Sequence, residues 1–195
     1  IEFLDDVLSL DPDFILLQWY TNDAEGRDKS RRPMPYRLIP SDYVSGLLHR
    51  NSALYYLLKQ KWNELQSALG LIGSYSESMD ERFGGPESAD SRRYDRELSE
   101  FVTKVNNHNL GMGIVLFPNL VETGGNLDKY PFGYLFDRVL SVCIENNIEC
   151  VDLRQVLDPD MPVSELWVNR LDSHPSAAVN AIAADAILER FTKQW

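Results

Sequence analysis

Residues 14–20 read FILLQWY, a nearly continuous apolar run, and this stretch decides the fold class. Such a run is typical of a strand that is buried on both faces, as in a parallel sheet. Asp11-Pro12 ends a short helical pattern just before it, and Thr21-Asn22-Asp23 are turn residues just after it. We therefore predict a buried parallel strand over residues 14–20.

The rest of the chain alternates between strand and helix patterns. Apolar runs at residues 113–117 and 148–153 predict two more buried strands. Apolar residues at helical spacing predict four helices, over Ser41 to about Leu69 with a break near Asn51-Ser52, over 91–109, over 131–147, and in a final stretch carrying Ile182 and Phe191. Strands that alternate with helices favour an α/β fold around a parallel sheet.

Two polar segments, residues 24–40 and 70–89, contain Pro or Gly and are predicted to be irregular. They are longer than ordinary connections between secondary-structure elements. Open parallel sheets bind ligands at the carboxyl ends of their strands. We therefore expect these segments to cover a site at that end of the sheet.

The composition excludes several classes of protein. The chain has 195 residues, which is enough for one mid-sized domain. Lys and Arg total 19 against 30 Asp and Glu, so the net charge of −11 argues against binding to nucleic acid. No apolar run approaches the roughly 20 residues of a transmembrane helix. The sequence does not indicate a cellular compartment.

The two cysteines, Cys143 and Cys150, both lie in apolar settings. We expect them to be buried free thiols, with a disulfide as the alternative. No His or Cys pair has the spacing of zinc ligands, so the sequence predicts no metal site.

His174 is the strongest candidate for chemistry among the three histidines. It lies between Asp172 and Pro175, before the last predicted helix. A carboxylate two residues from the imidazole can accept a hydrogen bond from one ring N–H, which fixes the tautomer that a general base needs. The structural alternative is a turn in which Asp caps the helix and Pro begins it.

Asn22 follows the carboxyl end of the predicted strand 14–20. Its side-chain amide can donate a hydrogen bond into a cleft and stabilise an oxyanion. The alternative is an ordinary turn at the end of the strand, because Asn and Asp are common turn formers.

Two blocks of the chain together resemble the GDSL/SGNH hydrolase superfamily. Residues 10–23, LDPDFILLQWYTND, resemble its third block, an apolar strand that usually ends in Gly-x-Asn-Asp. Residues 171–176, LDSHPS, resemble its fifth block, which holds the catalytic Asp and His. The resemblance in element order covers essentially the whole chain. It implies a three-layer α/β/α sandwich with a parallel, flavodoxin-like sheet, in a single domain over residues 1–195.

The resemblance also implies a role for each of three residues. Asn22 is the oxyanion donor, His174 is the general base, and Asp172 is the carboxylate that orients His174. Two departures concern these blocks. Tyr20 stands where the third block usually has Gly, and Asp172 lies two residues before the histidine where the fifth block usually has three.

The Gly-Asp-Ser block that holds the superfamily's nucleophile does not occur in this sequence. Ser91 and Ser173 each follow an Asp, but neither follows an apolar strand. In the superfamily this block precedes the strand that ends at Asn22. We therefore expect the chain to lack the first strands of the domain, with an N-terminal fragment or a partner chain carrying Gly-Asp-Ser beside residues 14–20.

The predicted function is that of a serine esterase that acts through an acyl-serine intermediate. The resemblance implies no metal and no organic cofactor, and it implies a small ester substrate, such as an acetylated carbohydrate or a lipid ester. Two alternatives stay open. One is a catalytically inactive scaffold or binding module, and the other is an O-acyltransferase that uses the same triad.

Overall fold

The computed structural model describes residues 3–25, 52–71, 75–85, 87–120, 127, 130–169 and 172–193. The chain divides into two compact units, and each is considered separately below. One comprises Ile1–Arg27 and Arg82–Trp195, and the other comprises Asp28–Glu81.

The first unit is built on a parallel sheet of three strands, β1 (Phe14–Tyr20), β2 (Gly111–Phe117) and β3 (Glu149–Asp152). The strands lie in the order β1-β2-β3, with Phe14 opposite Gly111 and Gly113 opposite Glu149. The chain therefore has the mixed α/β character that the alternating pattern predicts. Because the strands are parallel, their carboxyl ends meet at one end of the sheet. No strand in the described part of the chain pairs with the other edge of β1.

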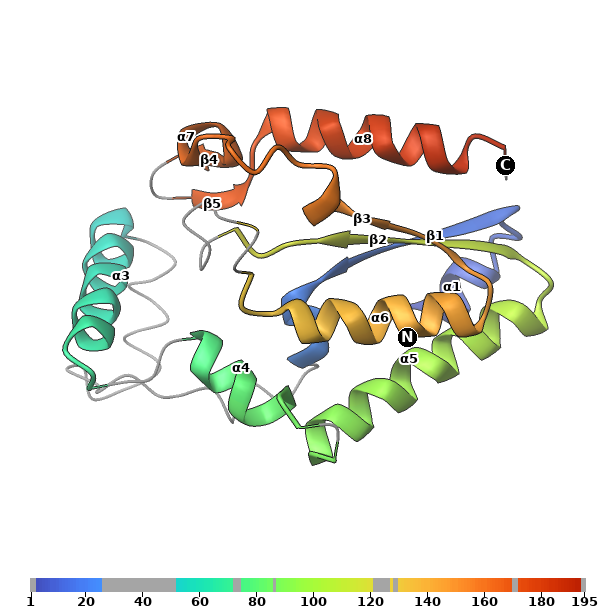
Figure 1. Ribbon diagram of the computed structural model, residues 1–195, viewed down its shortest axis with the longest axis horizontal. Helices are drawn as coiled ribbons and strands as arrows, with labels where there is room; N and C mark the ends of the chain where they lie inside the picture. Colours follow the sequence, from blue (N-terminus) through green and yellow to red (C-terminus); the bar gives the residue numbers. More distant parts are fainter. Residues whose placement is uncertain are drawn as a thin grey trace. The chain divides into compact units, whose positions relative to one another are not determined.

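One face of the sheet is covered by α5 (Ala89–Asn107) and α6 (Gly133–Glu145) (Figure 1). Trp19 of β1 is buried there between Tyr94 of α5 and Phe136 of α6, with ring centroids 6.4 and 5.1 Å apart. Burial of these aromatic rings supplies a large share of the apolar contact on this face. Packing between the two helices therefore accounts for the position of Trp19.

The opposite face of the sheet is covered by α8 (Ala177–Phe191) (Figure 1). Phe191 is fully buried and its ring lies directly over Gly113, where any Cβ atom would overlap it. The Phe14 ring lies beside it, with a centroid distance of 5.9 Å. Glycine at position 113 is thus what lets the aromatic ring of α8 approach the backbone of the central strand.

Helix starts in this unit follow the capping rules. The Ser88 hydroxyl accepts a hydrogen bond from the Ser91 N–H at the start of α5, and the Ser176 hydroxyl accepts one from the Val179 N–H at the start of α8. A short helix, α1 (Leu4–Leu8), precedes β1, and Lys104 of α5 pairs with its Asp5. The predicted helices 91–109 and 131–147 are confirmed within two residues at each end.

A small antiparallel hairpin lies between β3 and α8, and the sequence did not predict it. The 3₁₀ turn Leu153–Gln155 and α7 (Val163–Leu166) lead into β4 (Trp167–Asn169) and β5 (Asp172–Pro175). Strands of three and four residues carry too little alternation to stand out from a loop.

The second unit contains α3 (Ala53–Ala68), and the predicted interruption near Asn51-Ser52 agrees with its start. The Ser52 hydroxyl accepts a hydrogen bond from the Tyr55 N–H. Residues 41–51 of the predicted helix lie outside the described residues. The prediction of an irregular segment over 70–89 is wrong, because α4 (Tyr75–Phe83) occupies its middle. Met79 and Phe83, one helical turn apart, are both buried, and this burial stabilises the helix.

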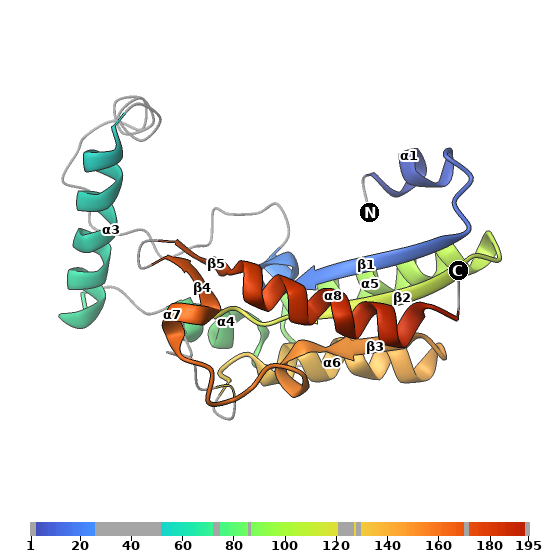
Figure 2. The same ribbon diagram turned by 90° about the horizontal axis from the view of Figure 1, so that it is seen from above.

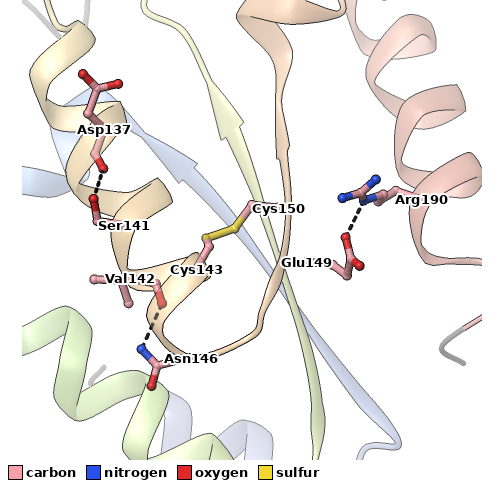
Figure 3. Close-up of a disulfide and its surroundings, with 8 residues drawn as sticks. All are labelled: Asp137, Ser141, Val142, Cys143, Asn146, Glu149, Cys150 and Arg190. Atoms are coloured by element: carbon pink, nitrogen blue, oxygen red, sulfur yellow. Dashed lines mark hydrogen bonds and ion pairs between the residues drawn. A yellow bond between two sulfur atoms is a disulfide. The ribbon is translucent and has the colours of Figure 1, made fainter.

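The expectation of free thiols is also wrong. Cys143 on α6 and Cys150 on β3 form a disulfide, with Cα atoms 6.4 Å apart (Figure 3). The connection turns sharply at Asn147, which has a φ of 54°, and the Ile148 N–H donates to the Cys143 carbonyl at 2.8 Å. This turn brings β3 back beside the last turn of α6. The helix end and this tight turn therefore bring the two sulfur atoms together across only seven residues.

Removal of the disulfide is expected to lower the free energy of unfolding. Replacing both cysteines by alanine opens a loop of about eight residues, for which the chain-entropy relation gives a loss of about 2.5 kcal/mol. Urea titration of the Cys143→Ala/Cys150→Ala variant against wild type measures this loss. In unfolded wild type, iodoacetamide is expected to add to the cysteines only after reduction, and adducts without reductant would contradict the pairing.

Candidate functional site

Asn22 lies in a short 3₁₀ helix, η1 (Thr21–Glu25), that follows the carboxyl end of β1. Its side chain is exposed, and it has no hydrogen-bond partner among the described residues. The Asp23 carboxylate instead accepts a hydrogen bond from the Tyr20 N–H at 2.7 Å. Asp23 therefore closes the end of the strand.

Tyr130 holds this turn from one side. Its buried hydroxyl shares a hydrogen bond of 2.7 Å with the Thr21 hydroxyl and accepts one of 2.8 Å from the Asn119 N–H. Thr21 follows β1 and Asn119 follows β2, so one phenol joins the carboxyl ends of two strands. Burial raises the pKa of Tyr130 to about 12, with the two hydrogen bonds opposing the rise, so the hydroxyl keeps its proton at neutral pH.

Two arginines, Arg93 on α5 and Arg82 on α4, also hold this turn. The Arg93 guanidinium donates to the carbonyls of Ala24 and Glu25 at 2.8 and 3.1 Å. Buried Arg82 bridges the carboxylates of Glu25 and Asp90 at 3.2 and 2.9 Å. Because η1 is tied at both its first and last residues, its exposed middle, which includes Asn22, is held in a defined position.

The carboxyl end of β3 carries an ion pair. The Arg154 guanidinium donates to both carboxylate oxygens of buried Asp152, at 2.6 to 3.0 Å. It also lies over the Phe136 ring, 4.2 Å from the centroid. Its charge is thus matched by Asp152, and the pair serves to pack the sheet end against α6.

Asp172 and His174 are in direct contact on β5. The His174 Nδ1 lies 2.5 Å from the Asp172 Oδ1, and the same oxygen accepts the His174 backbone N–H at 3.1 Å. The side chain of His174 is 86% exposed. This geometry holds the proton on Nδ1 and leaves Nε2 toward solvent, which is the arrangement that a general base requires.

The local structure around Asp172 and His174 is not the alternative considered from the sequence, a turn in which Asp caps the helix and Pro begins it. The cap of α8 is Ser176, and Pro175 lies on β5 rather than in the first helical turn. Asp172 therefore does not cap the helix, and its carboxylate is directed to the imidazole.

The hairpin that carries the pair lies at the carboxyl end of the sheet. The Trp167 indole N–H donates to the carbonyl of Leu120, just after β2, at 3.2 Å, and the Ser176 N–H donates to the Leu166 carbonyl at 2.9 Å. Figure 2 shows β4 and β5 on the side toward which the strand arrows point, where η1 also lies. Asn22 and His174 are thus at the same end of the sheet. Within the described residues no hydrogen bond joins Asn22 to either member of the pair.

Neither Asp-Ser sequence of the chain offers a free nucleophile. The Ser91 hydroxyl is buried and donates to the carbonyls of Phe83 and Gly85. Ser173 neighbours His174 on β5, and successive side chains of a strand point to opposite faces. Neither hydroxyl is therefore placed to give its proton to the imidazole.

The other two histidines are not seen at the site. His108 is exposed at the carboxyl end of α5, and His49 lies outside the described residues. Among the residues that the structure describes, no group of three or more His, Cys, Asp or Glu side chains is arranged to hold a metal ion. None of the described helices is long and apolar enough to cross a membrane.

The sequence did not reveal the residues that hold the Asn22 turn. Tyr130 lies 109 positions from Thr21 along the chain, and Arg93 lies 69 from Ala24. No local sequence pattern marks these two residues, because Tyr and Arg occur throughout helices and loops. They can be identified only from the structure, in which both contact the turn that follows β1.

Comparison with protein-family models, with curated proteins and with solved structures finds no match to this chain.

The contact with His174 lowers the pKa of Asp172. The hydrogen bonds from the His174 side chain and backbone hold the pKa of the Asp172 carboxyl below the ordinary value of 3.8. The folded chain thus binds this proton more weakly than the unfolded chain, so the contact stabilises the fold above about pH 4, and this contribution is lost as the pH falls through the folded pKa. Carbon-13 NMR of the Asp172 carboxyl is expected to show a higher midpoint in His174→Ala than in wild type, and equal midpoints would contradict the contact.

Proposed function

We propose that this chain is the acid–base and oxyanion-binding part of a serine ester hydrolase of the GDSL/SGNH type. The single observation that carries the proposal is the 2.5 Å contact between Asp172 and the exposed imidazole of His174. The rigidly held turn that displays Asn22 at the same end of the sheet supports it. The substrate class is a small acyl ester, either an acetylated carbohydrate or a lipid ester.

The finer fold is part of the same proposal. Helices cover both faces of the parallel sheet, as in a three-layer α/β/α sandwich (Figure 1). The outer edge of β1 is seven residues long and pairs with no described strand. Soluble proteins avoid such open edges. We propose that further strands pair there, and that the turn after one of them carries the serine of the Gly-Asp-Ser block.

The proposed reaction has two steps. The serine Oγ attacks the ester carbonyl carbon while its proton moves to Nε2 of His174, and Asp172 stabilises the imidazolium through the Nδ1–H. The side-chain N–H of Asn22 donates to the tetrahedral oxyanion. The C–O bond to the alcohol then breaks, and the alcohol leaves with the proton from Nε2. Water, activated by the same nitrogen, releases the acid from the acyl-serine.

The direct test is a covalent probe of the full gene product. A fluorophosphonate is expected to add to one serine, identified by peptide mass spectrometry, and a panel of p-nitrophenyl esters is expected to be hydrolysed. Absence of both the adduct and turnover would contradict the proposal and leave a scaffold without catalysis. Transfer of the acyl group to a sugar alcohol in preference to water would identify an acyltransferase.

Substitution of Asn22 separates its chemical role from a structural one. Asn22→Ala is expected to lower kcat by about 10²-fold, because one oxyanion donor is lost. The free energy of unfolding is expected to change by less than about 0.5 kcal/mol, because the side chain is exposed and makes no described hydrogen bond. Steady-state kinetics and urea titration measure the two effects.

Thr21→Val is the matched control, because it removes the hydrogen bond to Tyr130 beside Asn22 and is expected to lower stability as well as turnover. Unchanged kcat in Asn22→Ala, with a large loss of stability, would show that Asn22 acts only as a turn residue.

A further inference from the structure

A stripe of leucines lies exposed along α3, in the unit formed by residues 28–81. The exposed fractions of Leu54, Leu58, Leu65 and Leu69 are 66, 59, 48 and 63%. The Leu69 N–H donates to the Leu65 carbonyl at 2.9 Å, so the helical ladder continues to this residue. At about 100° per residue, the four side chains fall within an arc of about 60° on the helix surface.

The leucine stripe does not lie on the buried face of α3. Gln66 has an exposed fraction of only 1%, while the leucines lie in solvent. An amphipathic helix normally buries its apolar stripe and exposes its amides. Several exposed large aliphatic side chains on one helix face are typical of an interaction surface.

The spacing of the leucines is symmetric along the helix. Leu54 and Leu69 are equally far from the midpoint between residues 61 and 62, and so are Leu58 and Leu65. When two such helices pack antiparallel about a two-fold axis, each leucine of one copy meets a leucine of the other. A surface that matches itself in this way is what a closed two-fold dimer requires, whereas a lipid surface requires no such symmetry.

We propose that α3 is a docking surface for a second copy of this chain, with the two helices antiparallel and Leu58 facing Leu65 of the partner. Lys61 is exposed near the midpoint, where its long aliphatic stem can lie along the stripe.

The dimer is expected to be weak and to strengthen with salt. Four leucines on each copy are far fewer than the 20–30 residues per partner of a standard interface, so a Kd of about 10 µM to 1 mM is expected. Two chains that each carry a net charge of −11 repel each other, and salt screens this repulsion. Binding of Lys59 and Lys61 to anionic lipid would instead weaken with salt.

Sedimentation equilibrium of the full chain tests the association. Wild type is expected to dimerise over the range 10 µM to 1 mM, more tightly at 0.5 M than at 0.05 M NaCl, and Leu58→Glu is expected to raise Kd at least about tenfold. Leu188→Glu, an equally exposed leucine on α8, is the control and is expected to leave Kd unchanged. A wild type that stays monomeric at 1 mM overturns the proposal. Binding of that monomer to phosphatidylserine vesicles would assign the stripe to a lipid surface instead.

Cysteine cross-linking tests the relative orientation of the two α3 helices, with variants that are expected to fold. The native cysteines are paired with each other, so single cysteines are introduced as Leu58→Cys and Leu65→Cys. In the antiparallel pair position 58 faces position 65, whereas the two copies of position 58 are offset by seven residues, about 10 Å along the axis. Disulfides tolerate Cα separations of only about 4.4–6.8 Å.

Oxidation of a mixture of the two variants is therefore expected to give the 58–65 cross-link, with little dimer from either variant alone. Efficient cross-linking of Leu58→Cys to itself would show a parallel pair and overturn the proposed arrangement.

Discussion

His174→Ala is expected to lower kcat/KM for ester hydrolysis by about 10⁴-fold or more, because the serine loses the group that takes its proton. The same substitution is expected to abolish fluorophosphonate labelling of the serine. The imidazole is exposed, so its removal is expected to lower the free energy of unfolding only slightly, through the loss of its contact with Asp172. Initial rates with a p-nitrophenyl ester, intact mass after labelling, and urea titration measure the three quantities.

His108→Ala is the matched control, because His108 is also an exposed histidine but lies at the carboxyl end of α5. It is expected to leave both activity and labelling at wild-type levels. Undiminished labelling in His174→Ala would remove this residue from the mechanism. Asp172→Asn is expected to lower turnover as well, because an amide can no longer hold the proton on Nδ1 of His174.

Phe191→Ala is expected to lower the free energy of unfolding by about 3–5 kcal/mol. Phe191 is fully buried, and its ring fills the space above Gly113, so its removal leaves a cavity between α8 and the centre of the sheet. Urea denaturation followed by tryptophan fluorescence measures the loss. Because domains of this size are stabilised by about 5–15 kcal/mol, the variant is expected to be close to unfolding at 37 °C.

Leu188→Ala is the control for this variant, because Leu188 lies one turn earlier on α8 and is half-exposed. Its loss is expected to be within about 1 kcal/mol. A loss of comparable size in both variants would show that α8 is sensitive as a whole rather than through the contact of Phe191 with Gly113.

The strands and helices that the sequence predicted correctly are those with long patterns of apolar residues. The strand over 14–20 coincides with β1, because seven mostly apolar residues between two turns leave few alternatives. The helix α4 was missed, because its buried face consists of little more than Met79 and Phe83. The strands β4 and β5 were missed, because they are stabilised by pairing with each other rather than by their own pattern.

The candidate site likewise contains one contact that the sequence predicted and others that it did not. The contact between Asp172 and His174 spans two residues, so local spacing was enough to predict it. The Thr21–Tyr130 hydrogen bond depends on where the fold brings distant segments together, and no short motif encodes that. The disulfide joins residues only seven apart, but it depends on the end of α6 and the turn at Asn147, which the cysteine spacing alone does not show. Whether Asn22 and His174 act on one carbonyl stays a prediction, because each is placed by a different part of the fold.

The phenol of Tyr130 has a mechanical consequence for this end of the sheet. One oxygen atom bonds both the residue before Asn22 and the backbone after β2. A ligand that displaced either segment would pull on the Tyr130 hydroxyl through that segment's hydrogen bond. It would thereby also strain the hydrogen bond between Tyr130 and the other segment. In the proposed site, binding of a ligand at residue 22 is therefore expected to shift the polypeptide at residue 119 as well.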